Sequence, residues 1–144
     1  MSFTILEPEV AGGWGDETVA DTAVHPPIVS RLHYEFEGWL GDELLASFPC
    51  FIVSERVAAA LEASRLTGFA LDEVTISTSP EFEDLHPDVS LPRFRWLKVS
   101  GQAGVDDFGL AADFRLVVSA KGLGLLSRFT LKQADRTTHP GEGG

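Results

Sequence analysis

The chain has 144 residues, 44% of them hydrophobic, which suits a single soluble domain with a sizeable apolar core. Eleven Lys and Arg residues stand against twenty-two Asp and Glu residues, and the resulting net charge of -11 repels nucleic-acid phosphates and anionic lipids. We therefore expect a protein that binds neither nucleic acid nor membranes.

The charge is uneven along the chain. Residues 1–90 carry three basic and seventeen acidic side chains, whereas residues 91–144 carry eight basic and five acidic ones. An acidic surface keeps a small protein soluble, but it also attracts basic partners. A solvated surface and a partner-binding face are both open explanations.

The single cysteine, Cys50, lies in an apolar run, so we expect no disulfide within the chain and a buried, inert thiol. The first residues lack the basic and apolar segments of a signal peptide. No uncharged apolar stretch reaches the length of about eighteen residues that spans a membrane. These features predict a cytoplasmic protein.

The first part of the chain predicts a short strand at residues 3–6 and a glycine-rich loop at residues 7–27. Residues 28–37 predict a half-buried strand, because apolar and polar side chains alternate along it. His33 and Glu35 lie on its polar side, where they are either solvated or ligands of a metal ion. Side chains on one strand face are about 6–7 Å apart and rarely complete a metal site, so we expect a solvated face.

Two tryptophans occur in similar surroundings, Gly13-Trp14-Gly15-Asp16-Glu17 and Gly38-Trp39-Leu40-Gly41-Asp42-Glu43. Glycine permits a tight backbone that turns an indole either into the core or toward a partner. Burial is the simpler interpretation, because indoles contribute most to the stability of a small core. Trp39 with Asp42 and Glu43 is nevertheless a candidate for an aromatic and acidic contact.

A unit of strand, serine and helix is predicted twice. Residues 48–53 form an apolar run, Ser54 has the chemistry of a helix N-cap, and residues 55–66 show helical spacing. The same order returns at residues 114–131, with Ser119 in the position of Ser54. We expect the two units to frame one core.

Between the two units, residues 69–77 and 93–99 predict strands, and residues 79–92 predict a loop or a short helix interrupted by prolines. This proline-rich segment is the densest acidic run of the chain and contains Glu81, Glu83 and Asp84. It is either a hydrated excursion or a docking surface for a basic partner.

Together, these elements predict one α+β domain over residues 1–134. We expect a mainly antiparallel or mixed sheet of about five to seven strands with two helices. The polar, glycine-rich tail at residues 135–144 is expected to fray.

The residue patterns of known enzymes are missing. The sequence has no nucleophile-elbow serine, no closely spaced cysteine or histidine ligands and no phosphate-binding glycine loop. Its four histidines are scattered. We therefore expect neither enzymatic activity nor a bound metal or cofactor.

Six short segments occur in a characteristic order: Pro26-Pro27, Leu32-His33-Tyr34, Gly38-Trp39-Leu40-Gly41-Asp42, Phe51-Ile52-Val53-Ser54, Leu66-Thr67-Gly68-Phe69 and Leu116-Val117-Val118-Ser119. In this order the chain resembles small immunity proteins of bacterial polymorphic toxin systems. Such proteins are similar in size, are often acidic and protect the producing cell by occluding a cognate toxin. The resemblance implies a protein toxin as partner, but it carries over no site residue.

Two functional hypotheses follow. In the first, an immunity protein places an acidic, aromatic-bearing face on a basic toxin. The residues predicted for that face are Trp39, Asp42, Glu43, Glu81, Glu83 and Asp84. In the second, the chain is a small-molecule-binding or enzymatic α+β domain whose pocket lies near His33 and Glu35. The sequence does not indicate an oligomeric state.

Overall fold

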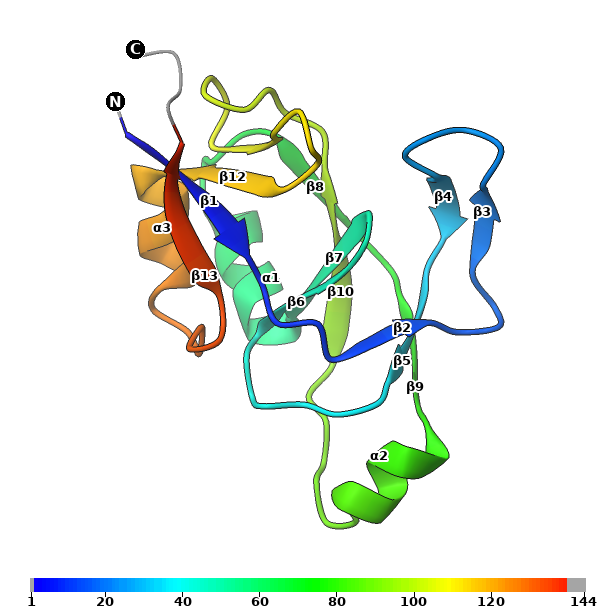
Figure 1. Cartoon of the computed structure of the whole chain (residues 1–144). Helices are drawn as coiled ribbons and strands as arrows, with labels where there is room; N and C mark the ends of the chain where they lie inside the picture. Colours follow the sequence, from blue (N-terminus) through cyan, green and yellow to red (C-terminus); the bar gives the residue numbers. More distant parts are fainter. Residues whose placement is uncertain (1, 140–144) are drawn as a thin grey trace.

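The computed structural model describes residues 2–139, which form four β-sheets and three helices (Figure 1). Two of the sheets have four strands each. The first has the order β11 (Phe108–Leu110), β12 (Leu116–Ser119), β1 (Phe3–Glu7) and β13 (Asp135–His139). The second has the order β6 (Leu44–Ser47), β7 (Cys50–Ser54), β10 (Phe94–Val99) and β8 (Phe69–Asp72). All of their strand pairs are antiparallel.

The other two sheets are smaller. A three-stranded sheet has the order β2 (Gly12–Trp14), β5 (His33–Phe36) and β9 (Thr75–Thr78), and β5 and β9 run parallel. A separate hairpin contains β3 (Val19–Asp21) and β4 (Ile28–Arg31). The helices are α1 (Glu55–Ala63), α2 (Pro80–Leu85) and α3 (Ala120–Leu126). Within residues 2–139, no helix combines the length and the apolar character needed to cross a membrane.

Two large apolar cores fill most of the interior, and Phe3, Ile5 and Val117 form a small third cluster. Helices α1 and α3 contact each other and pack with both four-stranded sheets around one core, which includes Leu6, Val53, Leu61, Leu97 and Val118. The second core is largely aromatic and is shared by the three-stranded sheet, β10 and α2. Its large side chains include Tyr34, Phe36, Phe82, Phe94 and Trp96. Phe82 is the buried side chain that attaches α2 to this second core.

The predicted repeat is present and is longer than the sequence indicates. Each unit consists of an acidic residue, a β-hairpin, a capping serine and a helix. In the first unit these are Glu43, β6, β7, Ser54 and α1, and in the second they are Asp107, β11, β12, Ser119 and α3. Ser54 and Ser119 accept hydrogen bonds from the N–H groups of Val57 at 3.3 Å and Gly122 at 3.0 Å, as N-caps do.

The acidic residue of each unit binds its own capping serine and the chain that follows the helix of the other unit. The hydroxyl of Ser54 donates to Glu43 at 2.9 Å, and the hydroxyl of Ser119 donates to Asp107 at 2.6 Å. The N–H of Thr130, after α3, donates to Glu43 at 2.9 Å. The N–H of Thr67, after α1, donates to Asp107 at 3.0 Å. We call these two reciprocal sets of contacts the carboxylate clasps.

The α+β class and the single domain agree with the sequence prediction, whereas the sheet and helix counts do not. One sheet of five to seven strands was expected, but the described residues form thirteen short strands in four sheets, with a third helix. The segment predicted as one strand at residues 69–77 is two strands, because β8 pairs with β10 whereas β9 pairs with β5 in a different sheet. Residues 135–139 do not fray, because they pair with β1 as β13; residues 140–144 lie outside the described residues.

Candidate partner-binding surface

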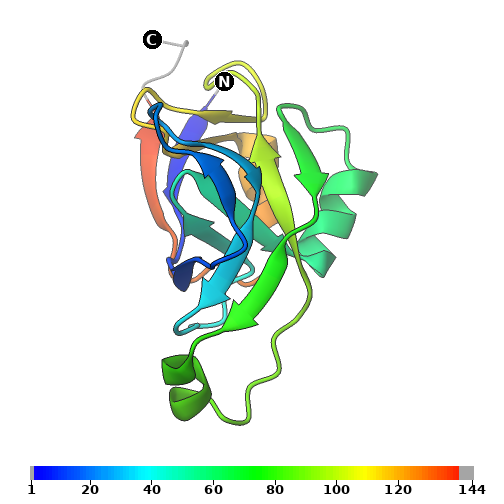
Figure 2. The same cartoon turned by 90° about the vertical axis from the view of Figure 1, so that its right-hand side faces the viewer.

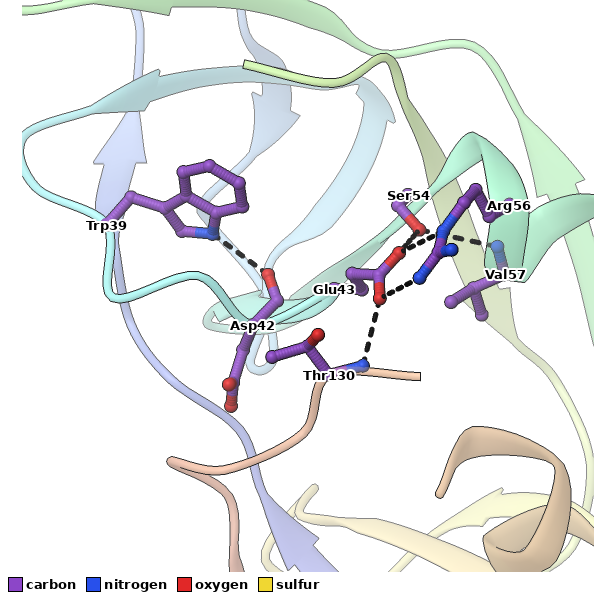
Figure 3. Close-up of polar contacts among 7 residues, drawn as sticks. All are labelled: Trp39, Asp42, Glu43, Ser54, Arg56, Val57 and Thr130. Atoms are coloured by element: carbon purple, nitrogen blue, oxygen red, sulfur yellow. Dashed lines mark hydrogen bonds and ion pairs between the residues drawn. The ribbon is translucent and has the colours of Figure 1, made fainter. Parts of the chain in front are cut away.

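Glu43 is a buried structural residue. Its side chain accepts hydrogen bonds from Ser54, from the N–H of Thr130 and from two nitrogens of Arg56 (Figure 3). Burial alone would raise the pKa of Glu43, but the hydrogen bonds from Arg56, Thr130 and Ser54 outweigh it and lower the pKa to about 2. Glu43 is therefore a carboxylate held in its charged form inside the protein.

Asp42 is also buried, with 0% of its surface exposed. Its two carboxylate oxygens accept hydrogen bonds from the N–H groups of Lys132 and Gln133, each at 2.8 Å. Both acidic residues thus fix the segment between α3 and β13. This burial corrects the expectation that Asp42 and Glu43 belong to an exposed docking face.

Trp39 is half-buried and points into the same region (Figure 3). Its ring nitrogen donates to the carbonyl oxygen of Asp42 at 2.9 Å, and its ring packs edge-on against Phe94 in the aromatic core. The following N–H, of Leu40, donates to Glu9 at 2.7 Å. Burial raises the pKa of Glu9, and this hydrogen bond only partly offsets the effect. The loop around Trp39 is thus held by internal bonds.

Helix α2 places the other predicted acidic residues on the surface. Ser79 caps the helix by accepting a hydrogen bond from the N–H of Phe82 at 3.1 Å, and Pro80 occupies the first turn. The side chains of Glu81, Glu83 and Asp84 are all exposed. In both views α2 stands away from the sheets at one end of the molecule (Figures 1 and 2). Of the two predicted forms of this segment, a loop or a short helix, residues 80–85 adopt the helix.

An exposed leucine accompanies these acids. Leu85, the last residue of α2, is 69% exposed, and Val89 in the following loop is exposed as well. When a partner covers a large apolar side chain such as Leu85, its apolar surface is removed from water, which favours binding. We call α2 with Glu81, Glu83, Asp84 and Leu85 the acidic arm.

His33, a polar group of the second hypothesis, is a buried structural residue. His33 is 7% exposed, and its Nδ1 accepts a hydrogen bond from the N–H of Glu17 at 3.1 Å. Its proton therefore lies on Nε2, which donates to the hydroxyl of Ser77 at 2.7 Å. One ring nitrogen thus binds the turn before β3 and the other binds the neighbouring strand β9. The expectation of a solvated His33 is wrong.

Metal ligation has no site among the residues described. Between residues 2 and 139, no group of three or more His, Cys, Asp or Glu side chains lies close enough to hold a metal ion. Glu35 is half-buried on β5.

A groove of about 1050 Å³ lies elsewhere, between β9 and the start of β10. Its apolar lining consists of Leu32, Val74, Ile76, Leu91, Phe94 and Trp96, and its charged lining of Arg31, Glu55, Asp72, Glu73, Arg93 and Arg95. We call it the β9–β10 groove. This groove was not predicted, because residues 69–77 looked like one continuous strand and the groove opens where that segment divides.

The acidic arm and the β9–β10 groove are adjacent along the chain. Strand β9 leads through Ser79 directly into α2 (Figure 2). The chain then returns through Leu91 and Arg93, which line the groove. The acidic arm and the β9–β10 groove together form the candidate partner-binding surface.

Comparisons with protein-family models, curated proteins and solved structures found no match to this chain.

A second, smaller groove of about 400 Å³ is basic. Four cationic side chains line it, those of Arg56, Arg128, Lys132 and Arg136. The guanidinium groups of Arg56 and Arg128 lie 5.3 Å and 5.9 Å from the centre of the Phe129 ring. This groove has the opposite charge to the acidic arm, so a basic partner would be attracted to the arm and repelled here.

Proposed function

We propose that the protein is an immunity protein, which binds and neutralises a cognate bacterial toxin. The observation that carries this proposal is the acidic arm, a projecting helix with three exposed carboxylates beside an exposed leucine. The net charge of -11 and the resemblance to small acidic immunity proteins support it. We leave Asp42 and Glu43 out of the proposed docking face, since both are buried.

Neutralisation would follow from the placement of these groups. The carboxylates of Glu81, Glu83 and Asp84 attract a basic toxin surface and accelerate the encounter. Contact with Leu85 then removes apolar surface from water and slows dissociation. Because α2 projects from the body of the protein, it can enter a concave basic site on the toxin and block access to it.

Charge reversal on the arm tests this proposal. The partner to test is the C-terminal domain of any large secreted protein that the neighbouring reading frame encodes. The triple variant Glu81→Lys, Glu83→Lys, Asp84→Lys is expected to bind that domain at least about tenfold more weakly, with a smaller salt dependence, and to stop protecting co-expressing cells.

The matched control reverses exposed acids elsewhere, through Asp16→Lys and Glu62→Lys, and is expected to leave protection intact. Full protection by the triple variant would rule out the acidic arm as the docking surface. The absence of binding between the wild-type protein and the toxin domain would reject the immunity proposal itself.

The β9–β10 groove favours a second candidate function, a small-molecule-binding or enzymatic domain. Its volume of about 1050 Å³ is at the upper end of ordinary ligand sites. Apolar side chains such as Ile76 and Trp96 provide apolar contact surface for a ligand, and Arg93 provides a positive charge. Neither His33 nor Glu35 lines it, so the site differs from the one first expected. A rise in melting temperature with a metabolite panel, removed by Trp96→Ala, would support this function over immunity.

A further inference from the structure

The outer edge of β9 has free backbone hydrogen-bonding groups. In the parallel pair with β5, the N–H of Thr75 donates to Leu32 at 3.0 Å, and the N–H of Ser79 donates to Phe36 at 2.8 Å. Successive residues of a strand direct their N–H and C=O groups to opposite sides. The backbone groups of Ile76 and Thr78 therefore point away from β5, on the side where β9 has no neighbouring strand.

The first residues of β10 have a similar free edge. The carbonyl oxygen of Arg93 accepts a hydrogen bond from the N–H of Glu55 at 2.8 Å, on the side of β7 and α1. By the same alternation, the N–H and C=O of Phe94 point to the opposite side. Strand β8 occupies that side only as far as the pair of Asp72 with Trp96, so it does not reach Phe94.

These two free edges face the same groove. Ile76 and Phe94 both line the β9–β10 groove, one from each wall. Several of its charged groups already have partners, since Arg31 pairs with Glu17 at 3.0 Å and Arg95 with Glu55 at 3.8 Å. A partner bound in this groove would therefore be recognised mainly by the free backbone edges and by the apolar side chains of the lining.

We propose that the β9–β10 groove binds an extended peptide segment of the protein partner as an added strand. Its backbone would pair with Ile76 and Phe94, joining the three-stranded sheet to the second four-stranded sheet. Alternate apolar side chains would lie on the groove lining, and Lys or Arg residues further along would reach the acidic arm, which continues directly from β9. This inference rests on the proposed function, because it assumes a basic protein partner.

A proline at position 76 tests the added strand. Ile76→Pro removes the N–H that points into the groove, while the native ladder uses Thr75 and Ser79 instead. Proline is tolerated on a strand edge whose N–H faces outward. The control Ile76→Val keeps the N–H and the β-branched shape.

The probe is a displayed library of random peptides selected on the wild-type protein. We expect enriched peptides with alternating apolar residues next to Lys or Arg, and at least about tenfold weaker binding to Ile76→Pro than to wild type or Ile76→Val. Enriched peptides that bind Ile76→Pro as well as wild type, or no enrichment at all, would overturn the inference.

A second measurement leaves the protein unchanged, in case Ile76→Pro fails to fold. Methylation of alternate backbone nitrogens in the best peptide removes its donors on one side, and we expect the same loss of binding. Unaltered binding of every methylated peptide would contradict an added strand. If arm charge reversal abolishes neutralisation while Ile76→Pro does not, the groove inference fails and the immunity proposal stands.

Discussion

Glu43 and Arg56 form a two-point ion pair, with the Nε and Nη2 atoms of Arg56 at 3.0 Å and 2.9 Å from the two carboxylate oxygens. This geometry fixes the orientation of the carboxylate as well as its charge. The same oxygens accept from Ser54 and Thr130, so one side chain joins β7, α1 and the segment before β13. Because these bonds are made to the ionised carboxylate of Glu43, the stability of the folded protein depends on pH.

Glu43→Gln is expected to lower the free energy of unfolding by about 2 kcal/mol at pH 7. The folded pKa of Glu43, about 2, lies below its ordinary value of 4.5. A depressed pKa contributes stability that is complete above pH 4.5 and is lost as the pH falls toward 2. Urea unfolding at a series of pH values should show this loss in the wild type and a flatter profile in the variant. Identical acid profiles would contradict the role given to Glu43.

Ser54→Ala and Ser119→Ala should each destabilise the protein by about 1–3 kcal/mol, because each removes an N-cap and a hydrogen bond to a clasp carboxylate. Ser79→Ala is the matched control. Ser79 caps α2 but has no carboxylate partner among the described contacts. Ser79→Ala should therefore lower the free energy of unfolding by only about 1 kcal/mol. Denaturant midpoints rank the three variants by stability. An equal loss of stability in all three variants would argue against the carboxylate clasps.

Gly68→Ala should be severely destabilising, by at least about 2 kcal/mol. Gly68 has a φ of 94°, and a Cβ there would collide with the carbonyl oxygen of Phe108, next to the second clasp. A Cβ at Gly38 would meet no atom within 4 Å. Gly38→Ala should therefore stay within about 0.5 kcal/mol of the wild type in thermal unfolding.

Cys50 should react with thiol reagents only after unfolding. The side chain is 5% exposed, and burial raises the pKa of its thiol to about 12, so very little thiolate exists at pH 8. A colorimetric disulfide reagent should give a negligible rate in native buffer and one equivalent of thiol in denaturant. Cys50→Ala provides the blank, and fast native labelling would show that the thiol is accessible.

Amide hydrogen exchange should distinguish the two sides of β9. The N–H of Thr75 is bonded to Leu32 and should exchange slowly, whereas the N–H of Ile76 points outward and should exchange quickly. On β10, the N–H of Arg95 should exchange slowly and the N–H of Phe94 should exchange quickly. Equal protection of neighbouring amides would mean that these edges are already paired.

Local patterns predicted the repeated units well. Ser54 and Ser119 precede helices whose spacing is visible in a few residues. The exposure of Glu81, Glu83 and Asp84 follows from their charge within a short proline-bounded segment. The role of Asp42 was not predictable in this way, because its partners Lys132 and Gln133 lie ninety residues further along the chain. A Gly-Asp-Glu sequence looks like an exposed turn until those distant N–H donors are known.

His33 and the β9–β10 groove were missed for a related reason. An alternating strand places His33 on the polar face, but whether that face meets water depends on the neighbouring segments, here Glu17 and Ser77. The groove arises from where β8 ends beside β10, which is a property of strand pairing and not of composition. Tertiary contacts decided both outcomes.

The carboxylate clasps make the two halves of the molecule mutually dependent. A backbone cut in the exposed segment between α2 and β10 would leave Glu43 without Thr130 and Asp107 without Thr67. It would also separate β1 from β12 and β7 from β10. The two fragments should therefore be unfolded alone and should assemble when mixed, so that the protein can serve as a split reporter whose reassembly signals that its halves have met.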